Sequence, residues 1–245
     1  MAINPAWRPD TAFILAAGEG RRLRPYTDNI PKPMVAVNGR PIIDQALDHL
    51  AAANVKNVFV NLHYKGDVLQ EHLSKQNTVP HLFFSAEDEL LDTGGGVKKM
   101  IPQIGDDAFY VLNGDALWTD GETAALDRMA MHWNPDIMDI LILLQPVNTM
   151  VLTQGFGDYT VTEDGRAIRS HDKSGTHMWT SIRICKPEIF STAPDGAFSF
   201  LKLLDEAETK GRLYALEHDA DWHHISTPAD LERVDKALNR QQKTA

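Results

Sequence analysis

The sequence predicts an α/β protein, a single three-layer domain around a mixed, mainly parallel central sheet. Short apolar runs typical of buried strands alternate with segments that carry apolar residues at helical spacing, which is the pattern of βαβ units. Glycine-containing turns follow some of these runs, where a strand would lead into a helix. After residue 148 the pattern changes to β-rich runs around an Asp-Gly turn, which indicates added antiparallel strands. The first half is therefore expected to be Rossmann-like.

The first half is expected to alternate strands and helices in chain order. Apolar, β-rich runs predict strands at 11–18, 56–64, 79–88, 108–115 and 138–147. Helical spacing of apolar residues, or a glycine turn that opens a helix, predicts helices at 41–55, 65–74, 93–105 and 121–133. Pro41 suits the start of the first helix, because a residue in the first turn needs no backbone donor.

The second half is expected to add antiparallel strands over one end of the sheet. Residues 157–170 alternate with period two around Asp164-Gly165, which predicts a hairpin. Further strands and helices are predicted at 177–185, 198–211, 212–219 and 227–242. Thr227 is suited to cap the last helix, with Pro228 at its first position.

Composition excludes several classes of protein. The 245 residues carry a formal net charge of -10, whereas a general nucleic-acid binder needs a broad basic face. One cysteine, Cys185, excludes an internal disulfide framework and fits a reducing compartment. The N-terminus lacks a secretory signal, and no apolar run approaches the ~20 residues that span a bilayer. We therefore expect a cytoplasmic protein that binds neither nucleic acid nor membrane, as a monomer or a homodimer.

The stretch LAAGEGRRLRPYTDNIPKP gathers four cations in an acidic chain. They are Arg21, Arg22, Arg24 and Lys32. The two acidic residues of the stretch cannot balance all four. Glycines after a strand let backbone N–H groups turn toward a phosphate chain, and a lysine between two prolines is held on a stiff segment. The spacing matches neither a Walker loop nor the dinucleotide fingerprint, whose third glycine is replaced by Leu23. These features predict a triphosphate site.

LAAGEGRRLRPYTDNIPKPMVAVNGRPII resembles the opening signature of the sugar-1-phosphate nucleotidylyltransferases. LLDTGGGV (90–97), LNGDALWTD (112–120) and DWHHISTPADLE (221–232) follow in the order and at the spacing of that family. The resemblance covers residues 11–238, is weakest at 148–176, and is closest to the short N-acetylmuramate-1-phosphate uridylyltransferases. It implies their Rossmann-like nucleotidyltransferase fold, with a nucleotide-binding half (11–147), a sugar-phosphate-binding half (148–238) and a polar tail (239–245).

The resemblance also implies the reaction, in which a sugar phosphate attacks the α-phosphorus of a nucleoside triphosphate and expels pyrophosphate. Positioning and charge stabilisation dominate such chemistry. Arg22 and Lys32 match the arginine on the triphosphate and the lysine at the reacting phosphate. The expected nucleotide contacts are Ala16, Ala17, Gly18, Gly20, Arg24, Glu87, Thr93, Gly94 and Gly95. The expected substrate contacts are Asn113, Lys173 and Ser181. For Lys173, an exposed loop lysine is the competing interpretation, since only the lysine of the relatives' Glu-Lys-Pro motif is present.

Asp115 ends an apolar strand and is expected to bind Mg²⁺, with Mn²⁺ as a possible substitute, because these ions prefer hard carboxylate oxygens. The family's second metal-binding aspartate aligns with His224, which we expect to be a weak or indirect ligand. Activity should then fall as the pH drops through ~6.5, where imidazole protonates. Alternatively, His224 only packs beneath the C-terminal helix.

Several functional alternatives remain open at this point. Uridylyl transfer from UTP to N-acetylmuramate 1-phosphate or a similar amino-sugar phosphate leads, and GTP-dependent guanylyl transfer to a mannose- or heptose-type phosphate is second. A non-catalytic nucleotide-binding regulatory protein belongs to another class, but it would not need Arg22, Lys32 and Asp115 together. A dehydrogenase is disfavoured by the missing third glycine. A zinc site among the ten histidines is disfavoured because cysteine partners are lacking.

Overall fold

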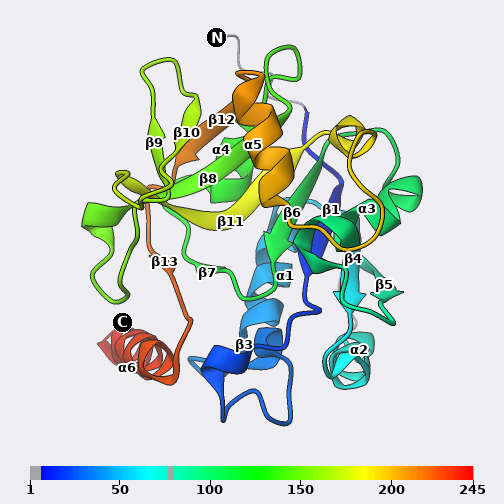
Figure 1. The fold of residues 1–245 in the computed structure, drawn as a ribbon. Coiled ribbons are helices and arrows are strands. Elements are labelled where there is room, and N and C mark those ends of the chain that lie inside the picture. The colour runs from blue at the N-terminus through cyan, green and yellow to red at the C-terminus, as the bar shows by residue number, and fades with distance from the viewer. Residues whose placement is uncertain (1–6, 77–79, 245) are drawn as a thin grey trace.

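The computed structural model describes residues 7–76 and 80–244 and confirms the α/β class (Figure 1). A nine-stranded sheet runs in the order β10-β9-β11-β6-β1-β4-β5, with β8 pairing with β11 and β12. The strands predicted in the first half are β1 (Thr11–Leu15), β4 (Asn57–Leu62), β5 (His81–Ala86), β6 (Phe109–Asn113) and β8 (Ile140–Pro146). Those added by the second half are β9 (Tyr159–Val161), β10 (Ala167–Arg169), β11 (His177–Cys185) and β12 (Leu213–Glu217).

Parallel pairing in the first half brings several strand ends to one edge of the sheet. β1 pairs in parallel with β4 and with β6, so that Leu15 lies opposite Asn113. β5 pairs in parallel with β4. Ligands bind at the carboxyl ends of parallel strands in open α/β sheets, because loops and helix starts meet there. This edge therefore positions the candidate site.

Helices cover both faces of the sheet, which confirms the three layers. On one face lie α1 (Ile42–Ala52), α2 (Gly66–Ser74) and α4 (Ala125–His132). On the other lie α3 (Asp92–Ile104) and α5 (Leu201–Thr209), in front of the sheet in Figure 1. Each strand presents alternate side chains to the two faces, so Ile14 joins the α1 core and Phe13 the α3 core. No helix in the described part of the chain is long and apolar enough to cross a membrane.

The position of β11 differs from the expectation for the second half. β11 pairs antiparallel with β6 on one side and with β8 on the other, so it lies inside the sheet rather than over its end. Most of its residues are buried, as a central strand requires. The 157–170 hairpin is confirmed as β9 and β10, which pair antiparallel beside β11.

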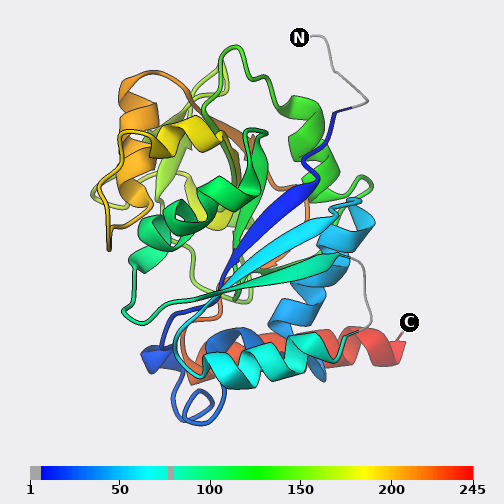
Figure 2. The ribbon, with the colours of Figure 1, turned by 90° about the vertical axis from the view of Figure 1, so that its right-hand side faces the viewer.

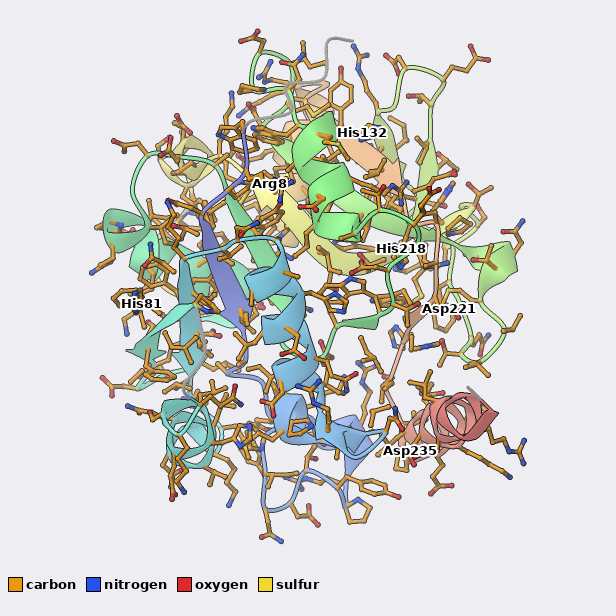
Figure 3. All side chains as sticks on the ribbon, turned by 180° about the vertical axis from the view of Figure 1, so that it is seen from behind. Arg8, His81, His132, His218, Asp221 and Asp235 are labelled. Carbon is orange, nitrogen blue, oxygen red and sulfur yellow. The ribbon has the colours of Figure 1, made fainter. Side chains whose placement is uncertain are left out.

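Short pairings that the sequence pattern did not predict fix the loops at the site. β7 (Leu117–Trp118) pairs antiparallel with β13 (Trp222–His223). The Thr119 N–H donates to the carbonyl of Asp221 at 2.8 Å, next to that ladder. Asp221 lies on the segment that runs from the sheet toward the C-terminal helix (Figure 3).

That C-terminal helix, α6 (Pro228–Thr244), packs against the basic loop at the other end of the chain. The two lie at the same end of the molecule in Figure 2. A third apolar cluster joins them and contains Leu23, Val35, Val37, Ile42, Leu117, Ile225, Leu231 and Val234. Asp235, labelled in Figure 3, accepts a 2.7 Å hydrogen bond from the Asn38 N–H in the turn between β2 (Ala36–Val37) and β3 (Arg40–Pro41). The predicted cap is confirmed, since the Asp230 N–H donates to the Thr227 hydroxyl at 3.3 Å.

Candidate active site

Two 3-10 turns hold the basic loop against the sheet edge. They span Arg21–Leu23 and Lys32–Met34. Gly20 precedes the first turn with φ 61°, and a Cβ there would lie 3.0 Å from side-chain atoms of both Lys32 and Thr27. The Thr27 hydroxyl donates to the Gly20 carbonyl at 2.9 Å. Glycine is therefore required at this position, both for its left-handed backbone and for the close approach of the two side chains.

Two of the four cations of the loop are neutralised at the surface. Arg21 pairs with Glu19, and Arg24 pairs with Asp28 at 3.5 Å. Such exposed pairs contribute little to stability. The Arg24 side chain lines neither of the two cavities described below. A phosphate contact by Arg24 stays a prediction, and it requires that side chain to leave Asp28.

The other two cations face the interior of the site. Lys32 forms an ion pair with Asp115, which lies 83 residues later in the sequence. Burial would raise the pKa of the Asp115 carboxyl, but the charge and hydrogen bond of Lys32 outweigh it, so the pKa lies below its usual value. Asp115 is consequently an anion at neutral pH. Arg22 is exposed and has no ion-pair partner among the residues that the structure describes.

A first cavity of about 200 Å³ opens at the ends of β1, β4 and β6. It is lined by Leu15, Ala16, Ala17, Gly18, Gly20, Lys32, Pro33, Asn61, Leu90, Asp92, Thr93, Asn113 and Asp115. Eight of the residues that the sequence predicts for the site are among them. Nothing lies within 4 Å of the position that a Cβ would take on Gly18, so the backbone is open to a ligand there.

Glu87 lies behind this cavity rather than on its wall. Its carboxylate accepts hydrogen bonds from the Asn61 side-chain amide at 2.8 Å and from the Leu91 N–H at 2.9 Å. The Asn61 side-chain oxygen in turn accepts a 2.7 Å hydrogen bond from the Ala16 N–H. Glu87 therefore orients Asn61, which holds the start of the loop that follows β1.

The glycine run also has a different place from the one expected. Gly94 and Gly95 lie in the first turn of α3, and their N–H groups donate to the Phe198 carbonyl at 2.8 and 3.2 Å. A Cβ on Gly94 would lie 2.3 Å from the Phe198 ring, and one on Gly95 would lie 2.2 Å from the Gly196 carbonyl oxygen. The run lets α3 pack closely on a neighbouring segment, and these two backbones do not line either cavity.

A substitution at Gly96 tests whether the contact between Asn61 and Glu87 stabilises the protein. A Cβ at this position would lie 2.7 Å from a Glu87 carboxylate oxygen and 2.8 Å from the Asn61 amide nitrogen. We expect Gly96→Ala to lower the free energy of unfolding by about 1–3 kcal/mol, as overpacking does. Denaturant titration measures this loss of unfolding free energy. Gly66→Ala is the matched control, because the closest atom to a Cβ on Gly66 is a side-chain carbon of Leu62 at 3.0 Å. A Gly96→Ala protein as stable as wild type would contradict this role.

A second cavity, of about 540 Å³, adjoins the first. Its lining includes Lys32, Asn113 and Asp115, which also line the first cavity. Its other lining residues are Arg22, Ala116, Phe156, Asp158, Tyr159, Arg169, Lys173, Met178, Trp179, Thr180, Ser181, Leu201, Trp222, His223, His224 and Ile225. Arg22, Lys173, Ser181 and His224 are therefore brought together in one cavity from three distant parts of the chain.

Two predicted substrate contacts shape the wall of the second cavity. Ser181 has φ 67°, at a register shift between Trp179 and Arg183 where β11 meets β8. A left-handed backbone disfavours a side chain, so Ser181 is held in a conformation that glycine adopts more readily. Lys173 is exposed and pairs with Asp158, which also accepts a 3.0 Å hydrogen bond from the Trp179 N–H.

His224 lies close enough to Asp115, Lys32 and Arg22 for their charges to act on it. Burial, with help from the Lys32 ammonium, lowers the pKa of His224 below its usual value of 6.5. The imidazole is therefore neutral at pH 7. The His224 imidazole is therefore expected to protonate at a pH lower than the ~6.5 predicted from the sequence.

The protein offers few donors to a cation. Among the described residues there is no group of three or more His, Cys, Asp or Glu side chains placed to hold a metal ion. Asp115 supplies a hard carboxylate and His224 a neutral imidazole at the junction of the cavities. Mg²⁺ commonly takes one or two protein carboxylates and completes its shell with phosphate oxygens and water. The two residues fit such a site only together with a bound triphosphate.

Sequence reasoning missed Asn61, Arg169 and Trp179. Asn61 is a buried polar residue near the end of an apolar strand, which is a signal that could have been noticed. Arg169 lines the second cavity and donates to both oxygens of Asp205, at 2.6 and 2.8 Å. Its contribution depends on the β9–β10 hairpin, which no local pattern assigns to the site.

Comparisons with known proteins agree with this geometry. Residues 11–173 match the family described as Nucleotidyl transferase. N-acetylmuramate alpha-1-phosphate uridylyltransferase from Caulobacter vibrioides is 34% identical over 226 residues, which cover 90% of this chain and 93% of that protein. D-glycero-alpha-D-manno-heptose 1-phosphate guanylyltransferase from Campylobacter jejuni is 34% identical over 223 residues, covering 89% and 96%. Percentage identity alone does not separate the two activities.

Solved structures share the fold. HddC from Yersinia pseudotuberculosis complexed with GMP-PN has a TM-score of 0.75 at 25% identity and covers 93% of this chain and 99% of that one. UDP-glucose pyrophosphorylase complexed with UDP-glucose has a TM-score of 0.76 at 16% identity, covering 98% and 100%. At 16% identity, the similarity to UDP-glucose pyrophosphorylase shows a shared fold alone.

Proposed function

Because the chain belongs to the nucleotidyl transferase family, we propose that it transfers the uridylyl group of UTP to an N-acetylmuramate-type sugar 1-phosphate. Nucleotidyl transfer to a sugar 1-phosphate is the enzymatic activity of the relatives. One observation carries the proposal: two cavities meet at Lys32, Asn113 and Asp115. The first cavity is built only from residues of the 11–147 half, and the second takes most of its wall from the 148–238 half. Two substrates can therefore meet at one point.

The reaction proposed at this point is a single displacement at phosphorus. A phosphate oxygen of the sugar phosphate forms a bond to the α-phosphorus of the nucleotide, and the bond from that phosphorus to the pyrophosphate oxygen breaks. No proton transfer is required, because the attacking oxygen is already ionised. Lys32 at the junction would stabilise the negative charge on the α-phosphate, and Arg22 would bind the leaving phosphates. Arginine suits that role because its planar fork matches phosphate oxygens.

The nucleotide is assigned to the first cavity. The backbone of Ala16, Ala17 and Gly18 would lie along the nucleoside and phosphates, and Thr93 would reach the ribose or the base. Gly94 and Gly95 would act indirectly, because they let α3 pack closely on the neighbouring segment and so place Thr93 on the wall of the first cavity. UTP is proposed over GTP because the uridylyltransferase relatives act on N-acetylmuramate 1-phosphate, the sugar phosphate proposed here.

A divalent cation is proposed as the cofactor, held by Asp115 and by phosphate oxygens, with His224 nearby. When bound, it would neutralise phosphate charge and orient the α-phosphate. Lys32 now neutralises Asp115, so the lysine would be released toward the nucleotide as the cation binds. Mg²⁺ and Mn²⁺ both fit a carboxylate, and an imidazole suits Mn²⁺ better.

We expect the identity of residue 224 to set the metal preference and the acidic limb of the pH profile. Wild type should work at least as well with Mn²⁺ as with Mg²⁺, and its kcat/KM should be retained to about pH 6.5 and decline below it. The decline begins below pH 6.5 because the pKa of His224 is lowered, so its imidazole stays neutral until the pH falls below that value. His224→Asp should shift preference toward Mg²⁺, and His224→Gln should lose the acidic limb. If neither variant changes either property, His224 is not part of the metal site.

Pyrophosphate release across a grid of nucleoside triphosphates and sugar 1-phosphates tests the function directly. The expected result is the highest kcat/KM with UTP and N-acetylmuramate 1-phosphate. A higher value with GTP and a manno-heptose 1-phosphate would support the guanylyltransferase activity that the Campylobacter relative's name gives. Nucleotide binding without release from any pair would indicate a regulatory protein instead.

A further inference from the structure

Arg183 of β11 carries a positive charge in the interior of the protein. Its side chain is fully buried, with 0% exposure. Burial lowers the pKa of the guanidinium to about 10, so it stays protonated at neutral pH, and no carboxylate of the described residues acts on it. A buried charge without a counter-charge is strongly unfavourable. Such a cation calls for an explanation.

Several hydrogen-bonding groups at and around Arg183 have no partner among the described residues. Its Nη1 donates to the Ser181 carbonyl at 3.3 Å, whereas Nε and Nη2 have no partner among the described residues. The Tyr159 hydroxyl and the Trp179 ring N–H are buried and unpartnered as well. Aromatic rings compensate part of the charge, since the guanidinium carbon lies 3.9 Å from the centre of the Phe200 ring and 5.3 Å from that of Trp179. What the cluster lacks among the described residues is a negatively charged acceptor.

This donor cluster (Tyr159, Trp179 and Arg183) borders the second cavity, and Arg183 itself is fully buried behind the cavity lining. Tyr159 and Trp179 line that cavity, as does Ser181, whose carbonyl Arg183 contacts. Ile182 pairs with Leu112, which places Ser181 beside Asn113 at the sheet edge and Arg183 two residues further into the sheet. The donor cluster therefore lies next to the point where the two cavities meet, on the sugar side.

Other cations of the second cavity already have anionic partners. Arg169 donates to both oxygens of Asp205, and Lys173 pairs with Asp158. The phosphate of the sugar has to reach the α-phosphorus at the junction, where Lys32 and Arg22 lie. The donors of the cluster remain for a different negatively charged group on the same substrate.

Building on the proposed function, we propose that the second cavity takes a sugar 1-phosphate that bears a carboxylate substituent, and that the donor cluster recognises this carboxylate. Tyr159 and Trp179 would donate to its oxygens at the cavity wall, and Arg183 would supply the charge from below. Carboxylate oxygens accept several hydrogen bonds at once, which matches a guanidinium, an indole N–H and a hydroxyl that can each donate. Of the two sugars named for the relatives, N-acetylmuramate has a carboxylate and manno-heptose has none. The cluster is then a specificity determinant.

Steady-state kinetics with a matched substrate pair tests this. The pair is N-acetylmuramate 1-phosphate and its uncharged carboxamide, each with saturating UTP. Wild type should favour the acid in kcat/KM by at least about 10-fold. Arg183→Met, which keeps the volume and removes the charge, should lower kcat/KM for the acid by about 30-fold or more and leave the amide nearly unchanged. The exposed Arg40→Met is the matched control and should change neither value.

A second variant keeps the test decisive if Arg183→Met does not fold. Tyr159→Phe removes only a buried hydroxyl without a partner, so it should fold, and it should weaken the acid selectively by about 3- to 10-fold. Equal use of acid and amide by wild type, or equal loss of both substrates in Tyr159→Phe, would overturn the carboxylate site while leaving nucleotidyl transfer intact. Failure of wild type with every sugar 1-phosphate would instead overturn the proposed function.

Discussion

Replacing Asp115 with asparagine lowers turnover by about 100- to 1000-fold while the protein stays folded. The magnitude corresponds to the several kcal/mol that a metal-held charge contributes in the transition state. Asparagine keeps the shape of the side chain but removes the negative charge that faces both Lys32 and the proposed cation. Since the Asp115 side chain is 32% exposed at the junction of two cavities, the substitution opens no hole in the core. The loss should therefore lie in kcat rather than in folding.

The measurement is turnover as a function of divalent ion concentration, for wild type and Asp115→Asn. If Asp115 holds the cation, the variant should also need a higher concentration of Mg²⁺ or Mn²⁺ to reach its own maximum. The double variant Asp115→Asn with Lys32→Met separates the two partners of the ion pair, because it leaves neither charge unpaired. Full activity of the single variant, or of wild type with excess chelator, would show that no cation acts through Asp115.

Removing the Lys32 ammonium has an expected effect of similar size. Lys32→Ala should lower kcat by about 30- to 1000-fold, because one charge-assisted contact made in the transition state contributes ~2–4 kcal/mol. Lys32 lies in a 3-10 turn at the junction, and its side chain is only 15% exposed. Its position between Pro31 and Pro33 holds the chain in one conformation, so the ammonium is positioned before substrate binds.

The basic loop supplies matched comparisons for that experiment. Arg22→Ala should lower turnover in the same range, since Arg22 is the arginine that faces the second cavity without an ion-pair partner among the described residues. Arg21→Ala should leave turnover within a few-fold of wild type, because Arg21 pairs with Glu19 at the surface. Circular dichroism and thermal unfolding check that each variant folds. Wild-type turnover by a folded Lys32→Ala protein is the result that would refute the assignment.

The sequence by itself determined the fold class and the chemistry of the basic loop. Apolar runs and apolar residues at helical spacing are local properties, so they predicted the α-helices that the structure describes between residues 41 and 211 and the main strands. Asp164-Gly165 predicted the hairpin, and Thr227 the start of the last helix, because turns and caps use only neighbouring residues. The family resemblance rested on the same kind of contiguous motif.

Only the tertiary structure decided which residues share a cavity. The pairing of Lys32 with Asp115 and the approach of His224 to both depend on strand order, which no local pattern encodes. The glycine run has a role in packing that its motif did not indicate, because Gly94 admits the Phe198 ring. Its contact with a nucleotide stays a prediction.

The burial of Arg183 likewise is seen only in the tertiary structure. In the sequence Arg183 is an ordinary polar residue of a strand, and its alternation with Ile182 suggests a solvent-facing side chain. The sheet places β11 between β6 and β8, and Phe200 at the start of α5 covers the guanidinium of Arg183, which is fully buried with no carboxylate of the described residues acting on it. A local pattern records the chemistry of each side chain, but the free energy of a charge depends on what surrounds it, and the fold alone determines that.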